Sequence, residues 1–213
     1  MSITLAAGTT VAIASTYGTQ FTVTAITNAS SMVATLSASH GVTANDIFEI
    51  TSGWPRLNTR ILKAASVSTN DVTCAVNTTS TTFYPAGSGT GTGREITAWT
   101  TITQLTKDIS SSGGDPQFAN TTTLDSPIET QIPTRLTPIA ISLPCYYDNS
   151  LSWVSTVQTA AETQALTAVR FSFPNGTILY GNGYWAYRYV PNIADETLRG
   201  EVTVTLTSLP TTV

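Results

Sequence analysis

Short runs in which apolar and polar residues alternate dominate this chain, and they limit what it can fold into. The clearest run lies in residues 198–208, where Val202, Val204 and Leu206 alternate with threonines. A period of two places one set of side chains in a core and the other in water, as in a half-buried β-strand. Similar runs recur about every ten residues with turn-forming clusters between them, which is typical of sandwiches and barrels. The sequence therefore predicts an all-β protein.

The strongest hairpin signal is FSFPNGTILYGNGYW, residues 171–185, in which Pro174, Asn175 and Gly176 form the turn between two alternating runs. The full set of expected strands covers residues 8–15, 20–27, 32–38, 46–52, 58–67, 71–77, 94–105, 138–148, 167–173, 177–189 and 198–208.

One flanking helix is expected before residue 167. Asp148, Asn149 or Ser150 is a suitable N-cap. The apolar residues near a 3.6-residue period are Leu151, Val154, Val157, Ala160, Ala161 and Leu166.

Two segments lack any sustained period. Residues 85–93, PAGSGTGTG, have the composition of a flexible linker, and we place a domain boundary there. Residues 107–134 are rich in turn formers, and a loop of that length in a compact domain is usually functional or mobile.

Charge is scarce and unevenly distributed. Charged residues make up 10% of the chain, and the formal net charge is −4. Residues 1–93 contain three basic and three acidic residues, whereas residues 94–213 contain six basic and ten acidic residues. The chain therefore lacks the basic footprint of a nucleic-acid-binding protein. A thinly charged, Thr-rich and Ser-rich surface is poorly defended against association, which suits a protein that assembles.

Groups for catalysis or metal binding are few. His40 is the only histidine, and the two cysteines are far apart in the sequence, which favours buried free thiols over a disulfide. Asp115, Asp125 and Glu129 could bind a hard cation or act as an acid–base pair, but a solvated loop explains them better. We expect no enzyme activity, cofactor, metal site, secretory signal or membrane span.

An aromatic cluster near the C-terminus allows two readings. Such side chains can stack on sugars, but they also serve as core residues or interface anchors, which we favour. The cluster comprises Tyr180, Tyr184, Trp185, Tyr187 and Tyr189.

The second part of the chain resembles the tail tube proteins of phages with long non-contractile tails (siphophages). The resemblance is carried by FPNGT at 173–177, the glycine- and aromatic-rich strand after it, and the closing run of alternating Thr and Val. TTLDSPIETQIPTRLTPIAISL (122–143) is similar to the family's long loop. AAGTTVAIAS (6–15) and ITAWTTITQLTKD (96–108) are similar to its first two strands. The resemblance implies a discontinuous tail tube domain, residues 1–16 and 94–213, with a sandwich- or barrel-like fold and one flanking helix.

Residues 17–93 depart from that family. ATLSASHGVTANDIFEITSGWPRLNTRILKAASVSTNDVTCAV resembles the small β-barrel of ubiquitin-activating enzymes, which also decorates phage structural proteins. We read this segment as a second, structural domain inserted into the first hairpin, where loop-closure entropy makes an insertion cheap.

The resemblance also implies a mode of action. Copies would form hexameric rings that stack into a tail tube, assembled in the host cytoplasm and carried in the virion. Other expected partners are the tape-measure, tail-tip and tail-terminator proteins, with double-stranded DNA in transit only and no membrane. The expected ring-to-ring arm is the 107–134 loop, with candidate contacts Asp108, Asp115, Phe118, Leu124, Asp125, Ile128, Glu129 and Ile132.

Excess acidity in residues 94–213 fits a bore that repels DNA, because a basic bore would bind phosphate. Asp195, Glu196 and Glu201 are the hypothetical lining residues. The rival interpretation is a carbohydrate-binding or adhesin-type β-sandwich on a virion or cell surface.

Overall fold

The computed structural model describes residues 7–194 and 196–213. Over these residues the protein is all-β with one helix, α1 (Ser152–Thr163). The strands up to the middle of the chain are β1 (Thr10–Tyr17), β2 (Phe21–Ile26), β3 (Met32–Leu36), β4 (Ile47–Ser52), β5 (Arg60–Ser68), β6 (Asp71–Cys74), β7 (Gly91–Ile102), β8 (Ser110–Ser112) and β9 (Pro116–Asn120). The remainder are β10 (Gln131–Leu136), β11 (Ala140–Tyr146), β12 (Thr167–Ser172), β13 (Ile178–Tyr187), β14 (Asn192–Ala194), β15 (Thr197–Leu206) and β16 (Thr211–Thr212).

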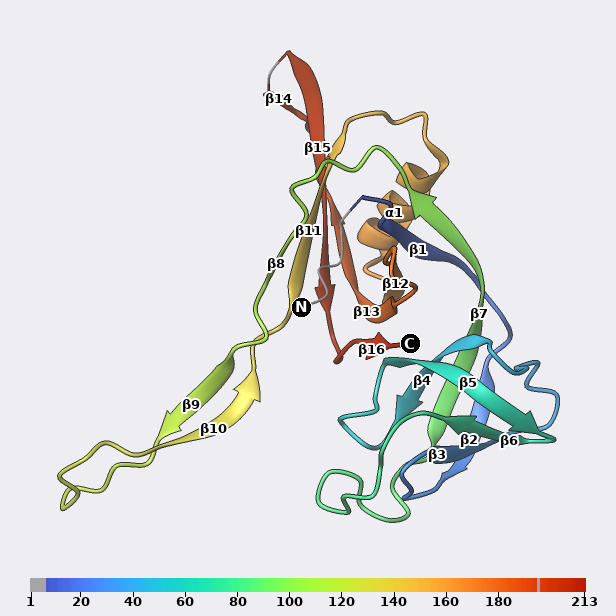
Figure 1. Cartoon of the computed structure of the whole chain (residues 1–213), viewed down its shortest axis with the longest axis vertical. Coiled ribbons are helices and arrows are strands. Elements are labelled where there is room, and N and C mark those ends of the chain that lie inside the picture. Colours follow the sequence, from blue (N-terminus) through green and yellow to red (C-terminus); the bar gives the residue numbers. More distant parts are fainter. Residues whose placement is uncertain (1–6, 195) are drawn as a thin grey trace.

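A small closed barrel lies at the lower right of Figure 1. Its strands follow the order β2-β3-β6-β5-β4-β7, and β2 also pairs with β7, which closes the circle. Phe48 and Ile50 are fully buried in its core, because the alternation of the strand turns one set of side chains inward, and Trp54 of the following loop is buried with them. The small β-barrel that the sequence predicted beside the main sheet is therefore present.

The other half of the molecule is a curved sheet in the order β7-β1-β12-β13-β15-β11-β8. Helix α1 covers one face of it, between β1 and β13 in Figure 1. Val154 and Val157 of the helix belong to the same buried cluster as Val202 and Val204 of β15. The opposite face carries the hydroxyl-bearing residues of β15, so the predicted division into an apolar and a polar face is confirmed.

Strand β7 is shared by the two halves. Its start pairs with β2 and β4 of the barrel, and its end pairs with β1 of the sheet. The expected linker at 85–93 is therefore wrong for residues 91–93, which are ladder residues. Their glycines serve close packing: a Cβ on Gly93 would lie 2.5 Å from the ring of Phe21 and 2.8 Å from the carbonyl oxygen of Glu49. Composition alone does not separate a flexible glycine from a closely packed one.

A polar cluster fastens the barrel to the sheet. Arg94 of β7 donates to Glu49 of β4 at 2.9 Å, and its guanidinium stacks over the ring of Tyr17 at 3.8 Å. The hydroxyl of Tyr17 accepts a hydrogen bond from the backbone N–H of Ala168 in β12 at 3.0 Å. On another side, the side chains of Asn182 and Ser208 both donate to the carbonyl of Thr59. The barrel is thus held against the sheet by contacts at two places.

The predicted hairpin is confirmed as β12–β13, with Ser172 opposite Ile178. In its turn, the N–H of Gly176 donates to the carbonyl of Phe173 at 3.0 Å, and Gly176 has a φ of +86°. The helix is also confirmed, but its predicted cap is wrong. The N-cap position is Leu151, with no side-chain cap, while the Asp148 carboxylate accepts hydrogen bonds from Ser150.

Candidate assembly surfaces

One border of the curved sheet is formed by the end of β7. Among the described residues, Thr97–Ile102 pairs only with β1, because β2 and β4 reach no further than Glu95. The next residues of the chain turn toward the opposite border. Backbone N–H and C=O groups on the free side of β7 are therefore available to a strand from another molecule.

The opposite border is formed by residues 104–112. β8 pairs with β11 on one side only, and all three of its serines are exposed. Just before it, the N–H of Thr106 donates to the carbonyl of Pro144, and the N–H of Tyr146 donates to the carbonyl of Gln104. This border is short, polar and unpaired on its outer side within the described part of the chain.

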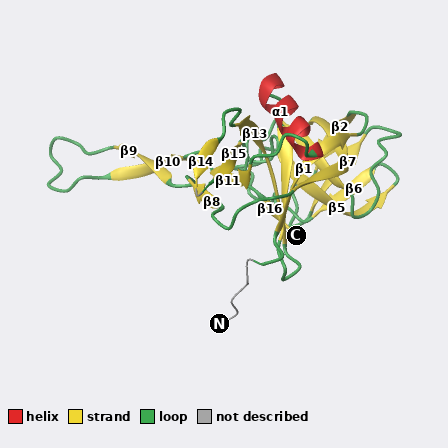
Figure 2. Cartoon of the chain, turned by 90° about the horizontal axis from the view of Figure 1, so that it is seen from above, coloured by secondary structure: helices red, strands yellow, loops and turns green. Residues whose placement is uncertain are grey.

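A long arm projects from the body in the connection between β8 and β11. It is the antiparallel hairpin β9–β10, which forms a separate two-stranded sheet. Figure 2 shows it extending away from the body with the connecting tip at its far end. The expected structureless loop at 107–134 is wrong here, because β8, β9 and most of β10 lie within it. No alternation marks β9 or β10, since both faces of the hairpin are exposed along nearly its whole length.

The arm carries most of the predicted contact residues. All of them except Asp108, which precedes β8, lie between residues 115 and 132. Leu124 and Ile128 at the tip are 108% and 73% exposed, and Phe118 and Ile132 are about half exposed. Hydrogen bonding from the Thr123 side chain lowers the pKa of the Asp125 carboxyl, so this tip residue stays ionised to lower pH. An exposed apolar arm of this kind is unfavourable in isolation and marks an interaction element.

The base of the arm is held by two glycines, Gly113 and Gly114, with φ values of +87° and +83°. A Cβ on Gly113 would lie 2.0 Å from the carbonyl oxygen of Pro138, so no other residue fits there. Beside them, the N–H of Asp115 donates to Thr137 Oγ1, and the N–H of Thr137 donates to the carbonyl of Asp115. The direction of the arm is thus fixed at its base by backbone geometry.

Two of the three residues predicted to line the bore, Glu196 and Glu201, lie among the described residues. Glu201 lies on the polar face of β15, where it pairs with Arg188 at 2.7 Å and accepts from Ser142 Oγ at 2.6 Å. Glu196 is exposed in the turn before β15, with a φ of +61°. Asp195 lies outside the described residues. Thr203 and Thr205 share the face of Glu201, opposite Ser142 and Ala140 of β11.

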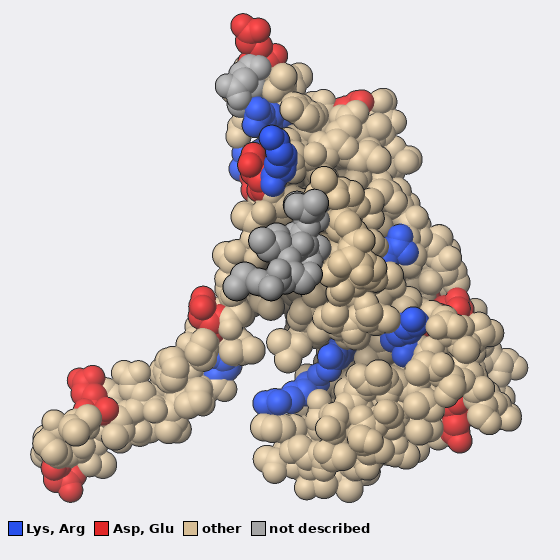
Figure 3. Space-filling view, in the orientation of Figure 1, with Lys and Arg blue, Asp and Glu red and all other residues tan. Residues whose placement is uncertain are grey.

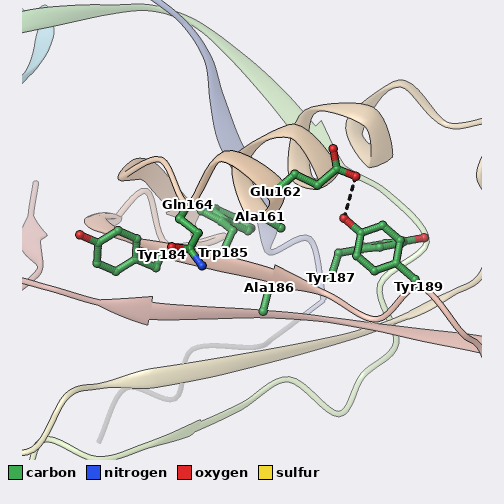
Figure 4. Close-up of a pocket in the computed structure, with 8 residues that line it drawn as sticks. All are labelled: Ala161, Glu162, Gln164, Tyr184, Trp185, Ala186, Tyr187 and Tyr189. Carbon is green, nitrogen blue, oxygen red and sulfur yellow. Dashed lines mark hydrogen bonds between the residues drawn. The ribbon is translucent and has the colours of Figure 1, made fainter.

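The aromatic cluster divides between the core and the rim of an open hollow of about 650 Å³. Figure 4 shows this hollow between the end of α1 and β13, with Glu162 and Gln164 above the tyrosines. Trp185 and Tyr187 are buried, whereas Tyr184 and Tyr189 are about half exposed. The Tyr189 hydroxyl donates to Glu162 at 3.1 Å. Desolvation and this bond to the carboxylate raise the pKa of Tyr189.

The two cysteines and the histidine, which are the other side chains considered for chemistry, are buried or hold a turn. Cys74 and Cys145 are free and buried, as expected, and burial raises their thiol pKa values to about 12 and about 11. His40 holds a turn, in which its Nδ1 accepts from the N–H of Val42 at 3.1 Å. Among the described residues, no group of three or more His, Cys, Asp or Glu is placed to hold a metal ion. No helix in that part of the chain has the length and apolar character to cross a membrane.

An all-β body with unpaired strand borders and a projecting apolar arm is typical of a protein that works by association. The phage tail tube protein family gives the match that this suggests: its model covers residues 52–213. The chain belongs to this family and is a structural component of a phage tail tube. No curated protein matches the chain significantly. The matched range begins at residue 52, within the expected insertion at residues 17–93.

Sequence reasoning missed the free border of β7 and the hollows, because both depend on which strands become neighbours. It also missed Tyr17 and Arg94 as junction residues. The one sequence signal for this junction was the pair of charged residues, Arg94 and Glu95, directly after the glycine-rich run.

Proposed function

We propose that copies of this chain close into hexameric rings, and that stacked rings form the tube through which a long, non-contractile tail delivers DNA. The observation that carries this proposal is a pair of borders at opposite sides of one sheet, Thr97–Ile102 and β8, whose outer sides pair with none of the described residues. A border of one copy that pairs with the opposite border of the next makes a heterologous contact, which closes into a ring when the rotation permits.

The arm supplies the axial contact in this proposal. It contacts little of its own chain, and its apolar side chains lack a core. Burying Leu124 and Ile128 against the next ring would contribute about 1.5–3 kcal/mol each. Six arms per ring would make stacking strongly cooperative.

The polar face of β11, β15 and β13 is the proposed wall of the bore. Its hydroxyl groups offer hydrogen bonds to water, and the Glu201 carboxylate neutralises Arg188. A wall without unpaired cations releases few counterions on meeting phosphate, so DNA slides past without being held. Asp195 and Glu196 would add negative charge near one end of this wall.

The small barrel occupies the connection between β1 and β7, which pair antiparallel with each other. This position supports our division into a tail tube domain, residues 1–16 and 94–213, and an inserted domain, residues 17–93. We also propose that the insert is related to the barrel of ubiquitin-activating enzymes. The tape-measure, tail-tip and tail-terminator proteins would be further partners of the tube, which would assemble in the host cytoplasm before entering the virion.

Electron microscopy of the purified protein at rising concentration tests the proposal. We expect rings and then tubes, whereas a persistent monomer at all concentrations would overturn it. The variant Thr101→Lys places a charge beside the free border of β7 and should stop ring closure. Thr24→Lys makes the same change at another exposed threonine, on a barrel strand, and is the matched control that should assemble normally.

A further inference from the structure

A second hollow, which we call the barrel hollow, opens where the C-terminal strand β16 meets the barrel. It measures about 350 Å³. Most of its lining is apolar or small, and the polar exceptions include Lys63. Lys63 is half-buried and forms no ion pair with any described residue.

A second cation lies next to this hollow. Arg60 donates through Nε to Thr211 Oγ1 at 3.0 Å, and Thr211 lines the hollow. Partial burial of the Arg60 guanidinium lowers its pKa. Figure 3 shows basic atoms on the side of the barrel that is turned toward the arm. The barrel hollow therefore combines a largely apolar lining with two basic side chains, Lys63 in the lining and Arg60 beside it, that form no ion pair with a described residue; this suits an apolar segment with a carboxylate.

The arm tip, residues 121–130, has that chemistry. Leu124 and Asp125 are adjacent, and Ile128 and Glu129 are adjacent, so each exposed apolar side chain has an acidic neighbour. Neither acid forms an ion pair with a described residue. Acidic atoms are visible at the outer end of the arm in Figure 3. The tip and the barrel hollow are thus complementary in both polarity and charge.

The larger hollow beside α1 is a poorer site for the same tip. Glu162 lines it and already accepts a hydrogen bond from Tyr189. An acidic tip would meet a carboxylate there, and like charges brought together at an interface are destabilising. The charge argument therefore selects the barrel hollow.

We propose that the arm tip of one copy docks in the barrel hollow of a second copy, with Leu124 and Ile128 on its apolar floor and Asp125 or Glu129 beside Lys63. This inference rests on the proposed function, and it names the surface that the stacking arm contacts. The inserted barrel then serves as the receptor for the arm and is part of the tube's axial joint.

Site-directed cross-linking tests the contact. Leu124→Cys and Ala65→Cys variants are purified separately, mixed, assembled and oxidised. Both positions are exposed, and Ala65 lines the barrel hollow. Cys74 also lines the barrel hollow, but it is only 1% exposed and burial raises its pKa, as it does for Cys145, so the native thiols contribute little background. A covalent dimer that contains one copy of each variant is expected on a non-reducing gel.

Gln164→Cys, at an exposed position that lines the hollow beside α1, is the matched control and should yield no such dimer. Tubes in which Leu124→Cys joins Gln164→Cys, or joins neither, would overturn the inference and leave the proposed function intact. If the wild-type chain forms no tube, the proposed function and this inference both fail.

Charge reversal provides an independent test. Lys63→Glu and Glu129→Lys should each raise the critical concentration for tube formation roughly tenfold, because each places like charges at the joint. A mixture of the two variants should regain assembly through the restored pair. Arg56→Glu makes the same change at an exposed barrel position outside the hollow and should assemble as the wild type does. Equal behaviour of Lys63→Glu and Arg56→Glu would contradict the inference.

Discussion

The ion pair between Glu49 and Arg94 yields a prediction whose size depends on which partner is removed. The Glu49 side chain is 7% exposed, whereas that of Arg94 is 38% exposed. Replacing Arg94 with Met leaves a buried carboxylate without its cation and removes the cation above Tyr17. Replacing Glu49 with Gln leaves a cation that can still reach water.

The two substitutions should therefore differ in cost. Removing one partner of a fully buried pair costs about 3–5 kcal/mol, and the partial exposure of Arg94 places Arg94→Met near the lower end, at about 3 kcal/mol. Glu49→Gln keeps the shape and a hydrogen-bond acceptor, so we expect a cost of about 1 kcal/mol. The difference of about 2 kcal/mol reflects the burial of the acid.

Urea denaturation of the unassembled protein measures both costs. With a slope of about 2–3 kcal/mol per molar urea, Arg94→Met should lower the midpoint by about 1 M. The double variant should cost less than the sum of the two single changes, because one interaction is lost in both. Equal costs for the two single variants, or costs below about 0.5 kcal/mol for both, would refute the view that this pair fastens the barrel to the sheet.

Three further predictions concern the core, the pH dependence and the bore. Trp185→Phe should cost about 1 kcal/mol more than Trp153→Phe in the same denaturation assay. Both indoles are buried, but only Trp185 donates a hydrogen bond, whereas the Trp153 Nε1 has no partner among the described residues. Burial raises the pKa of Tyr17 to about 12, so the unfolded chain loses this proton first. The contribution of Tyr17 to the free energy of unfolding should be fully present below about pH 10 and be lost as the pH rises toward about 12. Over that range the urea midpoint should fall less steeply for Tyr17→Phe than for the wild type. Glu201→Lys should leave tubes intact in micrographs but impair infection, because it adds a cation and frees Arg188; normal DNA delivery by that phage would contradict the proposed bore.

Alternation identified those strands that have one buried and one wet face. β15 is the clearest case, since Val202, Val204 and Leu206 are buried and the threonines between them are not. The hairpin turn at Pro174–Gly176 was equally predictable from the sequence, because a turn depends on the dihedral preferences of its own residues. The strands of the arm were missed for the converse reason. With no buried face, β9 and β10 leave no period in the sequence.

The candidate surfaces were only partly predictable. Residues 107–134 stood out in the sequence because they lack a sustained period and are rich in turn formers, and their role as contact residues stays a prediction. Lys63 and the free border of β7 gave no such signal. Each acquires its role from its neighbours: Lys63 lines the barrel hollow with β16, and the end of β7 is left unpaired where the barrel ends.

The sequence by itself determined the class of the fold, the position of the helix and the main hairpin, since these follow from local periodicity and local dihedral preferences. Only the tertiary structure decided that β7 serves both halves, that the barrel closes through β2, and that two borders of the sheet have no partner among the described residues. These outcomes depend on which distant strands pair, and pairing is chosen by the packing of whole faces against one another. The physical character of each strand is local, but the identity of its neighbour is not.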